Sequence, residues 1–348
     1  MTSSGVTRTM DKERYNNLDG LRAYACIGII LMHIRANGDF AITGFAYDKI
    51  IASFTNFTFL FMVLSAFSMC CGYYERFKSS SISLERFYVR RYERIWPFFA
   101  ILCTIELIVD HSLTSLYEWF ADLTLAFGLL PNAKISVVGV GWFIGVIFVF
   151  YMIFPFFTFL IGNKKRAWVV FTIAVILNIL CTIYFFDENH VLEEFGDRSN
   201  IIFSSMFFVA GGLIYLYREQ IKRVNTWIVG ASVLLSCLFY YFVNASQYTM
   251  LVLFSLLSIL GIRADGTISR VILQNKVISF IAKISMEIFL CHMFVYRVIE
   301  RLKLLHITGN EYLNYIAVSA ATVIGAVVMA FVLKKLIESV QKKVAKAA

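Results

Sequence analysis

Ten long apolar segments, separated by short polar or basic breaks, decide what this chain can fold into. They run roughly over residues 18–36, 50–72, 94–111, 138–161, 167–186, 200–217, 226–244, 247–262, 278–298 and 312–336. An α-helix needs about 20 residues to cross a bilayer, and each segment is close to that length. Only 16% of the residues are charged, whereas about a quarter are charged in a soluble domain. The sequence therefore predicts an all-α polytopic membrane protein with about ten transmembrane helices, and it excludes an ordinary soluble enzyme.

The distribution of Lys and Arg predicts how these helices are oriented. With the N-terminus in the cytoplasm and ten crossings, 25 of the 32 basic residues fall on the cytoplasmic side, which is the positive-inside pattern of membrane proteins. The net charge of +9 is therefore not interpreted as a sign of nucleic-acid binding, because the basic residues lie between the apolar segments. We expect a multi-pass protein of the cell membrane with both termini cytoplasmic: an N-terminal tail (1–17), a single membrane domain (18–336) and a basic C-terminal tail (337–348).

Two further segments are expected not to span. The apolar stretch 116–130 carries Glu118 and Asp122, and a crossing there would invert every later loop and destroy the charge asymmetry. We therefore expect a non-spanning helix at the outer face. Segment 84–96 mixes Arg with Phe, Tyr, Ile and Trp, which is typical of a basic segment lying at the cytoplasmic interface before the third helix begins.

Ionisable side chains inside apolar helices are costly unless they are paired or hydrated, so they carry the most information. The first helix contains Arg22 and His33, whose spacing of eleven residues puts them on one face, about 16 Å apart along the axis. Asp19 lies three residues before Arg22 and can pair with it. A lone His in such a helix is more often bonded to a neighbouring helix. Two ionisable groups on one face instead favour a polar cavity.

Other helices carry weaker signals. In the ninth segment Glu287 and His292 lie about 140° apart, so they are expected to face different ways. A helix–helix hydrogen bond and a functional role are equally good interpretations of His292. Trp142 and Tyr151 share a face of the fourth helix, where aromatic packing is the default interpretation. The pair at 211–212, both Gly, predicts a close contact between helices.

The densest basic cluster consists of Arg90, Arg91 and Arg94. Arg91 and Arg94 are three residues apart and lie on one helical face. Contact with anionic lipid would explain the cluster. The alternative is an anion site for a phosphorylated ligand that arrives from the cytoplasm. The seven Cys residues show no metal-ligand spacing, so we expect no metal.

Five motifs in order resemble those of the membrane acyltransferase-3 family, over about residues 14 to 300. The first helix has Arg22 and His33 with ten residues between them, which is similar to the first-helix motif of that family. The segment Phe61–Ser68 resembles the second-helix motif, although Ala66 stands where Gly is common. The other three are the RxxR segment with Arg91 and Arg94, the W-F to Pro helix of residues 142–155, and the helix S-M-E-I-F-L-C-H of residues 285–292.

This resemblance implies ten membrane helices and O-acyl transfer from an acyl-CoA, usually acetyl-CoA, to a carbohydrate. Residues 145–151 lack the Glu-rich segment of the peptidoglycan-type members, and we expect no C-terminal SGNH domain. The chain is therefore more similar to the stand-alone members, which modify exopolysaccharide, surface antigens or lipid-linked sugars in the cell envelope. The implied partners are acetyl-CoA, a carbohydrate acceptor and membrane lipid.

The resemblance also implies roles for residues. The phosphates of coenzyme A would be held by Arg91 and Arg94 together with Arg90, and Arg22 would guide the pantetheine arm. His33 would act as general base on the acceptor hydroxyl or, alternatively, as a transient acyl carrier. Candidate oxyanion or substrate-site residues are Ser65, Trp142, Tyr151, Glu287 and His292. We expect a polar cavity that leads from the basic side to His33.

Two other classes of function stay open from the residues alone. Ten helices with buried His, Arg and Glu also suit a proton-coupled transporter of a small solute. Transporters usually have broken helices, whereas the spans here lack Pro except near their ends. A scaffold or lipid-binding membrane protein without enzymatic activity is the third possibility.

Overall fold

The computed structural model describes residues 15–130, 138–191 and 196–347, and every regular element in these ranges is a helix. Each of the ten predicted apolar segments coincides with helical structure. The main helices are α1 (Asn16–Asn37), α2 (Phe57–Lys78), α3 (Leu84–Val109), α5 (Trp142–Leu160), α6 (Lys164–Leu180), α7 (Ile201–Leu216), α9 (Thr226–Phe242), α10 (Gln247–Arg263), α13 (Ser285–Arg301) and α14 (Glu311–Ala347).

Shorter elements connect or extend these helices. The short α-helices are α4 (Leu113–Leu123), α8 (Arg218–Ile221), α11 (Thr267–Leu273) and α12 (Lys276–Lys283). The single-turn pieces of 3₁₀ or π geometry are η1 (Ala46–Ile51), η2 (Phe54–Asn56), η3 (Phe127–Leu129), η4 (Gly139–Gly141), η5 (Cys181–Phe185) and η6 (Asp197–Ser199).

The lengths of the helices fit a polytopic membrane protein but do not confirm ten crossings. Within the described ranges, four continuous helical stretches are long and apolar enough to span a membrane: Ala46–Lys78, Gly139–Leu160, Lys164–Phe185 and Glu311–Lys343. Two bent pairs raise the number to six if each is one span, namely α10 with α11 (118°) and α12 with α13 (81°). Helices α7 and α9 are apolar but shorter than this criterion requires.

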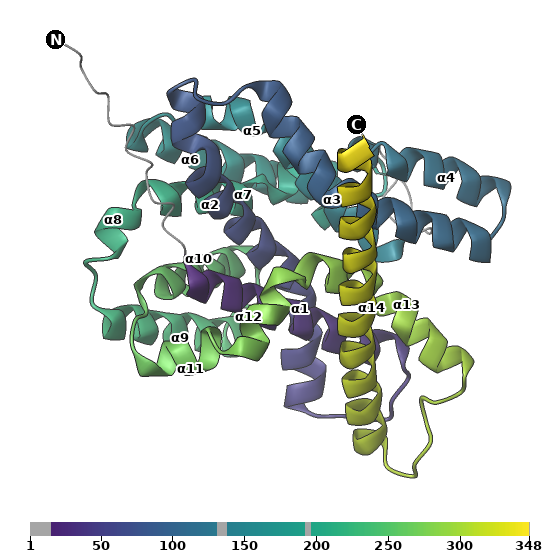
Figure 1. Cartoon of the computed structure of the whole chain (residues 1–348). Helices are drawn as coiled ribbons and strands as arrows, with labels where there is room; N and C mark the ends of the chain where they lie inside the picture. Colours follow the sequence, from purple (N-terminus) through teal and green to yellow (C-terminus); the bar gives the residue numbers. More distant parts are fainter. Residues whose placement is uncertain (1–14, 131–137, 192–195, 348) are drawn as a thin grey trace.

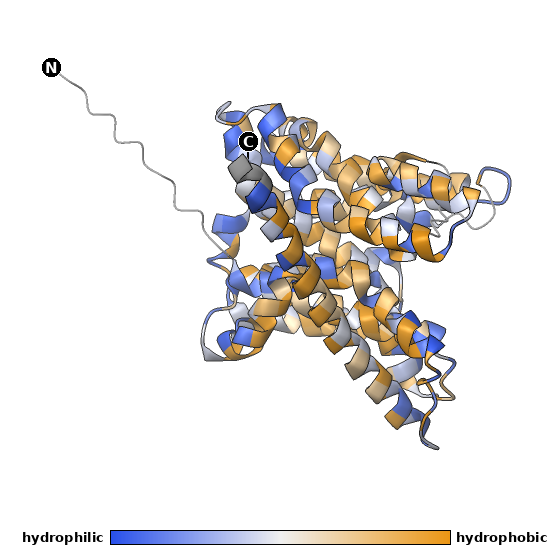
Figure 2. Cartoon of the chain, turned by 45° about the vertical axis from the view of Figure 1, so that its right-hand side comes forward, coloured by the Kyte–Doolittle hydropathy of each residue, from blue (hydrophilic) through white to orange (hydrophobic). Residues whose placement is uncertain are grey.

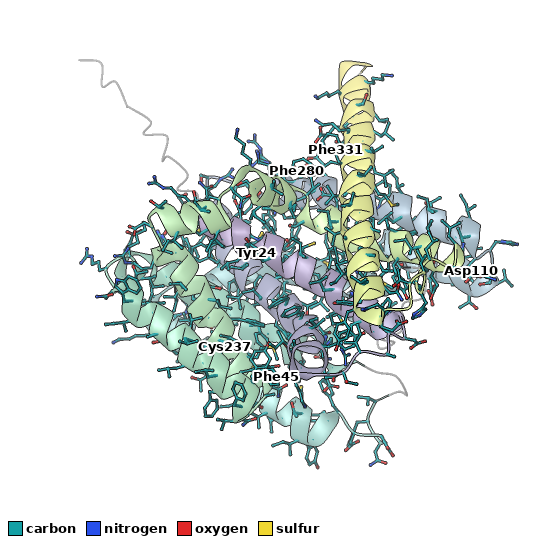
Figure 3. The ribbon with its side chains drawn as sticks, turned by 90° about the horizontal axis from the view of Figure 1, so that it is seen from below. Tyr24, Phe45, Asp110, Cys237, Phe280 and Phe331 are labelled. Atoms are coloured by element: carbon teal, nitrogen blue, oxygen red, sulfur yellow. The ribbon has the colours of Figure 1, made fainter. Side chains whose placement is uncertain are left out.

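The outside of the helices is rich in apolar side chains. Trp227 on α9 is 84% exposed, and Ile183 in η5 is 76% exposed. Figure 2 shows hydrophobic colour along the walls of the helices and hydrophilic colour mainly at loops and helix ends. In Figure 3, Phe280 and Phe331 lie together beside α14, and their ring centres are 5.8 Å apart. An apolar outer surface of this extent is suited to contact with hydrocarbon rather than with water.

Helix α1 lies in the middle of the bundle (Figure 1). It contacts α2, α10, α11, α12, α13 and α14. Glycines allow some of these close approaches: a Cβ atom at Gly20 would lie 2.3 Å from the carbonyl oxygen of Leu273, and one at Gly28 would lie 2.5 Å from the Phe57 ring. The helix that carries Arg22 and His33 is therefore surrounded by other helices.

The segments expected not to span have different outcomes. Helix α4 has 11 residues, or about 16 Å, which is too short to cross a bilayer. Burial raises the pKa of Asp122 on α4 to about 7. Residues 84–96 are part of the third helix, because α3 runs without a break from Leu84 to Val109, with Pro97 inside it. Their expected place at the cytoplasmic interface stays a prediction. The Ser83 side chain caps this helix by accepting from the Arg86 amide at 3.2 Å, so the helix begins at Leu84.

The ninth apolar segment is broken where the sequence predicts one helix. Helix α12 ends at Lys283, α13 begins at Ser285, and the two axes differ by 81°. This break has no Gly or Pro. It removes the argument that unbroken spans disfavour a transporter.

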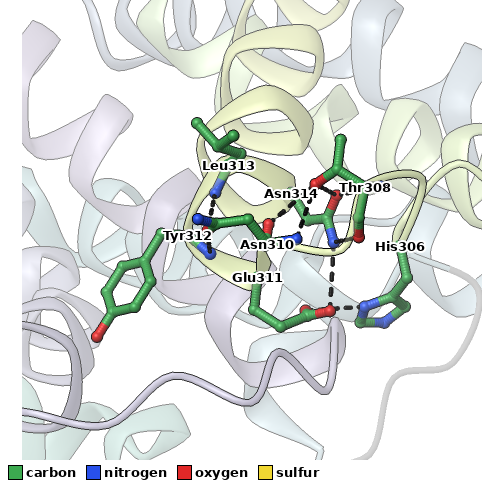
Figure 4. Close-up of polar contacts among 7 residues, drawn as sticks. All are labelled: His306, Thr308, Asn310, Glu311, Tyr312, Leu313 and Asn314. Carbon is green, nitrogen blue, oxygen red and sulfur yellow. Dashed lines mark hydrogen bonds and ion pairs between the residues drawn. The ribbon is translucent and has the colours of Figure 1, made fainter.

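The beginning of α14 is fixed by a polar cluster in the loop before it (Figure 4). The side-chain oxygen of Asn310 accepts from the amides of Tyr312 and Leu313 at 2.9 and 3.2 Å, which caps the helix. His306 Nδ1 lies 2.9 Å from a carboxylate oxygen of Glu311. The helix then continues through residues 337–347, so the described part of the expected basic C-terminal tail is helical.

The close contact predicted at residues 211–212 is confirmed, and it gives a test of the packing. A Cβ atom at Gly211 would lie 2.2 Å from the Val63 carbonyl oxygen and 2.8 Å from the Ala66 Cβ, so α7 could not stay against α2. Overpacking of this kind costs about 1–3 kcal/mol. We expect Gly211→Ala to lower the midpoint of thermal unfolding of the purified protein in detergent.

Gly230 is the matched control for this substitution. It also lies inside a helix, α9, but a Cβ atom there meets nothing within 4 Å. Gly230→Ala should leave the midpoint unchanged or raise it, because Ala is favoured over Gly in helices by about 0.5–1 kcal/mol. Equal midpoints for the two variants would contradict the close α2–α7 contact.

Candidate active site

Arg22 is held in place by three groups on α1 and α2. Its Nη1 atom donates to Asp19 Oδ1 at 2.7 Å, which confirms the predicted pair. Its Nη2 atom donates to the Leu64 carbonyl oxygen at 2.8 Å and to Ser68 Oγ at 2.5 Å. The guanidinium is therefore fixed between α1 and α2 rather than extended toward lipid headgroups.

Arg91 on α3 is oriented by aromatic side chains. Its Nη2 atom donates to the Tyr73 hydroxyl at 2.9 Å, and its guanidinium carbon lies 5.0 Å from the centre of the Tyr73 ring and 5.7 Å from that of Tyr151. Contacts of this kind between a guanidinium and ring faces are attractive. The Nε atom of Arg91 is buried and has no hydrogen-bond acceptor among the described residues, so one donor of this side chain is unused.

A positively charged cavity of about 450 Å³ lies between α1, α2, α3, α5 and the break that separates α12 from α13. Its charged lining residues are four cations and one carboxylate: Arg22, Arg91, Arg94, Lys283 and Asp19. Arg94 is exposed and makes no hydrogen bond or ion pair that involves a described side chain. Low-dielectric walls strengthen the field of such a cluster, so the cavity is suited to a polyanion.

A smaller cavity of about 90 Å³ adjoins the larger one and is bounded by aromatic rings. The two share Arg22, Arg94 and three polar side chains: Ser65, Tyr151 and Ser285. The smaller cavity also touches Phe61, Phe143 and Phe289, whose ring centres lie 5.5 to 6.4 Å apart. We call these three residues the aromatic trio.

His33 on α1 and His292 on α13 form a hydrogen bond of 3.0 Å between His33 Nδ1 and His292 Nε2. The other ring nitrogen of His292, Nδ1, lies 2.6 Å from the carbonyl oxygen of Phe289. His292 is 0% exposed, whereas His33 is partly exposed. The helix–helix hydrogen bond that the sequence allowed for His292 is thus present, and its partner is the candidate catalytic residue.

A polar cavity lies beside Arg22, Arg91 and Arg94, as the sequence predicts. Its expected extension to His33 stays a prediction. Neither imidazole is among the residues that line the two cavities. Phe289 lines the smaller cavity, and its ring centre is 6.0 Å from that of His292. Phe289 of the aromatic trio therefore lies between the smaller cavity and His292. Helical spacing indicates which residues share a face, but it does not show which side chains of other helices lie between them.

The remaining predicted site residues divide into two groups. Ser65 and Tyr151 line both cavities. Arg90, Trp142 and Glu287 line neither. Arg90 is half-buried elsewhere on α3, and Trp142 packs at the beginning of α5 with its ring centre 5.9 Å from that of Phe143.

Two buried carboxylates form ion pairs between helices. Glu287 Oε1 on α13 accepts from Lys334 Nζ on α14 at 2.5 Å. Glu106 on α3, with a side chain 8% exposed, binds Arg297 on α13 through both carboxylate oxygens. Among the residues that the structure describes, no three His, Cys, Asp or Glu side chains come close enough to hold a metal ion.

Sequence reasoning missed three residues that shape the site. Ser68 binds Arg22, Tyr73 binds Arg91, and Lys283 lines the larger cavity. The spacing of three residues between Ser65 and Ser68 places both on one face of α2 and was a usable signal. No sequence pattern distinguishes Tyr73 from the other aromatic residues of α2.

Comparison with known proteins gives a family for this arrangement. No solved structure matches the chain. A Haemophilus influenzae protein, described only as an uncharacterized protein, is 25% identical over 210 residues, which are 52% of this chain and 85% of that protein. Residues 15–333 match the sequence model of a family described as an acyltransferase domain. This range includes both cavities and the histidine pair, and the chain belongs to the acyltransferase-3 family of membrane acyltransferases.

Proposed function

We propose that this protein transfers an acetyl group from acetyl-CoA to a hydroxyl group of a cell-surface or lipid-linked carbohydrate. The observation that carries the proposal is the cavity of about 450 Å³ with four cations and one carboxylate in its lining. Coenzyme A carries several phosphates, and arginine forks are well matched to phosphate oxygens. The family supplies the reaction type, and the cavity supports this choice of acyl donor.

Two arginines of the larger cavity would bind the phosphates. Arg91 is oriented by Tyr73 and keeps its Nε atom unused, and Arg94 has no protein partner among the described residues. Arg22 is held by Asp19 and Ser68, so it would face the pantetheine arm rather than move with the phosphates. The cavity lies among basic residues, and such residues are concentrated on the cytoplasmic side of membrane proteins. This supports entry of the donor from the cytoplasm.

His33 would provide the acid–base chemistry. As a general base it would take the proton of the acceptor hydroxyl while that oxygen attacks the thioester carbonyl carbon. The carbon–sulfur bond then breaks, and the proton neutralises the departing thiolate of coenzyme A. This role is typically worth about 10²- to 10⁴-fold in rate. The alternative is a transient acyl-His33, which would pass the acyl group to the acceptor in a second step.

The aromatic trio sets a requirement for this chemistry. Phe289 lines the smaller cavity and lies beside His292, so a thioester that passes from this cavity toward His33 would have to displace the Phe289 ring. His33 lines neither cavity and is still partly exposed. The exposed part of His33 would be the place where the acceptor hydroxyl reaches the ring.

Proton-coupled transport of a small solute is the second candidate function. The 81° break between α12 and α13 favours it, because broken helices are a common feature of transporter binding sites. Uptake of solute into proteoliposomes driven by a proton gradient, with no release of coenzyme A from acetyl-CoA, would support transport and contradict acyl transfer.

Replacement of the proposed base tests the proposed function directly. We expect His33→Gln to reduce release of coenzyme A from acetyl-CoA by about 10²- to 10⁴-fold, measured with purified protein and a carbohydrate extract of the cell envelope. His306→Gln is the control, because His306 is exposed and pairs with Glu311 outside the site. Equal activity of the two variants would remove His33 from the mechanism. Labelled acetyl-CoA without acceptor would trap protein-bound label only if His33 is an acyl carrier.

Two neighbouring arginines test the donor site. Arg94→Gln removes a cation from the cavity lining, and a charged hydrogen bond is worth about 1.5–3 kcal/mol. We therefore expect the Kd for coenzyme A, measured by calorimetry in detergent, to rise by at least about tenfold. Arg90→Gln removes the same charge from the same helix at a position outside the cavity and should change the Kd little. A similar change in both variants would indicate general attraction rather than a phosphate site.

A further inference from the structure

We propose that His292 is a positioning residue, which holds His33 as the tautomer with a proton on Nδ1 and thereby makes Nε2 the only nitrogen able to act as base. The catalytic meaning of this inference rests on the proposed function. The tautomer itself follows from hydrogen bonds alone and is testable without any activity.

The first step is the protonation of His292. Its Nδ1 atom lies 2.6 Å from the Phe289 carbonyl oxygen, and a carbonyl oxygen can only accept a hydrogen bond. Nδ1 must therefore carry a proton. In a neutral imidazole one nitrogen is a donor and the other is an acceptor, so Nε2 of a neutral His292 carries a lone pair.

The second step is the charge of His292. The side chain is 0% exposed, and an unpaired charge is very costly when it is fully buried. No described carboxylate contacts the His292 ring. Glu287, the nearest acidic residue along α13, is bound to Lys334. His292 is therefore neutral, and its Nε2 accepts.

The third step assigns His33. The distance of 3.0 Å between His292 Nε2 and His33 Nδ1 is a hydrogen bond, so His33 Nδ1 must be the donor. The lone pair of His33 is then on Nε2. When Nε2 takes a proton from a hydroxyl group, the Nδ1–H bond to His292 is kept, so the ring does not turn. A third group that orients a catalytic base is the general logic of such sites.

This assignment also decides against His292 as an oxyanion donor. Its single N–H is bound to Phe289, its lone pair is bound to His33, and it lines neither cavity. No donor of His292 is left for a developing negative charge.

The geometry between the two rings is fixed by two further contacts of the same helices. Cys26 donates through Sγ to the Ser285 carbonyl oxygen at 3.3 Å, and the Tyr296 hydroxyl donates to the Asn37 carbonyl oxygen at 2.7 Å. These contacts and the histidine pair all join residues 259 positions apart in sequence. Helices α1 and α13 therefore run parallel in one register, and the histidine pair lies between the two other contacts.

Nitrogen-15 NMR of the histidine-labelled full chain in nanodiscs tests the assignment. The chain has five His residues, so His33→Gln and His292→Gln identify the two relevant sets of signals. We expect, for both residues, an Nδ1 signal of the protonated, pyrrole type and an Nε2 signal of the unprotonated, pyridine type at neutral pH. A protonated Nε2 of His33 in the unmodified protein overturns the proposal.

A pair of variants tests the positioning role. His292→Leu removes the imidazole that accepts from His33 Nδ1 at 3.0 Å, and we expect kcat to fall about 10- to 100-fold, within the range of a general base. The KM for acetyl-CoA should not change, because His292 lines neither cavity. His292→Gln, whose amide oxygen can accept from Nδ1–H, should recover part of the loss. An unchanged kcat in the Leu variant, or equal losses in both, overturns the role.

These results separate the present inference from the proposed function. The expected signals in a protein that never cleaves acetyl-CoA would contradict acyl transfer and confirm the hydrogen-bond assignment. Cleavage of acetyl-CoA by a protein whose His33 carries its proton on Nε2 would confirm the transferase and overturn this inference.

Discussion

The parallel contact between α1 and α13 is the constraint on which the rest of the site depends. Three hydrogen bonds join the two helices with one constant separation in sequence, and the middle one links His33 to His292. The same α1 carries Arg22, which is bound to α2. One rigid helix therefore presents a cation to the larger cavity and an imidazole about 16 Å further along its axis. A shift of α13 by one residue along α1 would break the histidine pair.

The cations in and around the site fall into two groups, those that line the larger cavity and those that form ion pairs between helices. Cations that line the larger cavity have one carboxylate among them, so they keep a positive field that suits a polyanion. Two partly buried cations outside the cavity are paired with buried carboxylates: Arg297 with Glu106, and Lys334 with Glu287. Both pairs join α13 to a neighbouring helix, which is costly to break once the charges are buried. Glu106 and Glu287 thus help to hold the helix that carries His292.

Some of this arrangement could be predicted from the sequence, and the reasons for the failures are physical. Apolar length located all ten main helical regions, and helical spacing predicted the pair of Asp19 with Arg22, because both depend on local periodicity. The 81° break at Ile284 was missed because tertiary packing decides it. The aromatic trio comes from α2, α5 and α13. No spacing within one helix reveals that three such rings meet.

The aromatic trio and the tautomer of His33 together bear on the choice between a general base and an acyl carrier. Both mechanisms use Nε2 if Nδ1 is bound to His292. A general base needs only the acceptor hydroxyl in contact with Nε2. The thioester then contacts the hydroxyl oxygen and need not touch His33. A carrier needs the thioester carbon itself in contact with Nε2. The Phe289 ring would then have to move further than it would for a general base. Acylation would also leave a positively charged ring beside a neutral His292 that is fully buried and cannot compensate the charge as a carboxylate would. With the neutral partner that we propose, direct transfer is the favoured hypothesis, in which His33 would hold a positive charge only while the proton is on its way to the departing thiolate.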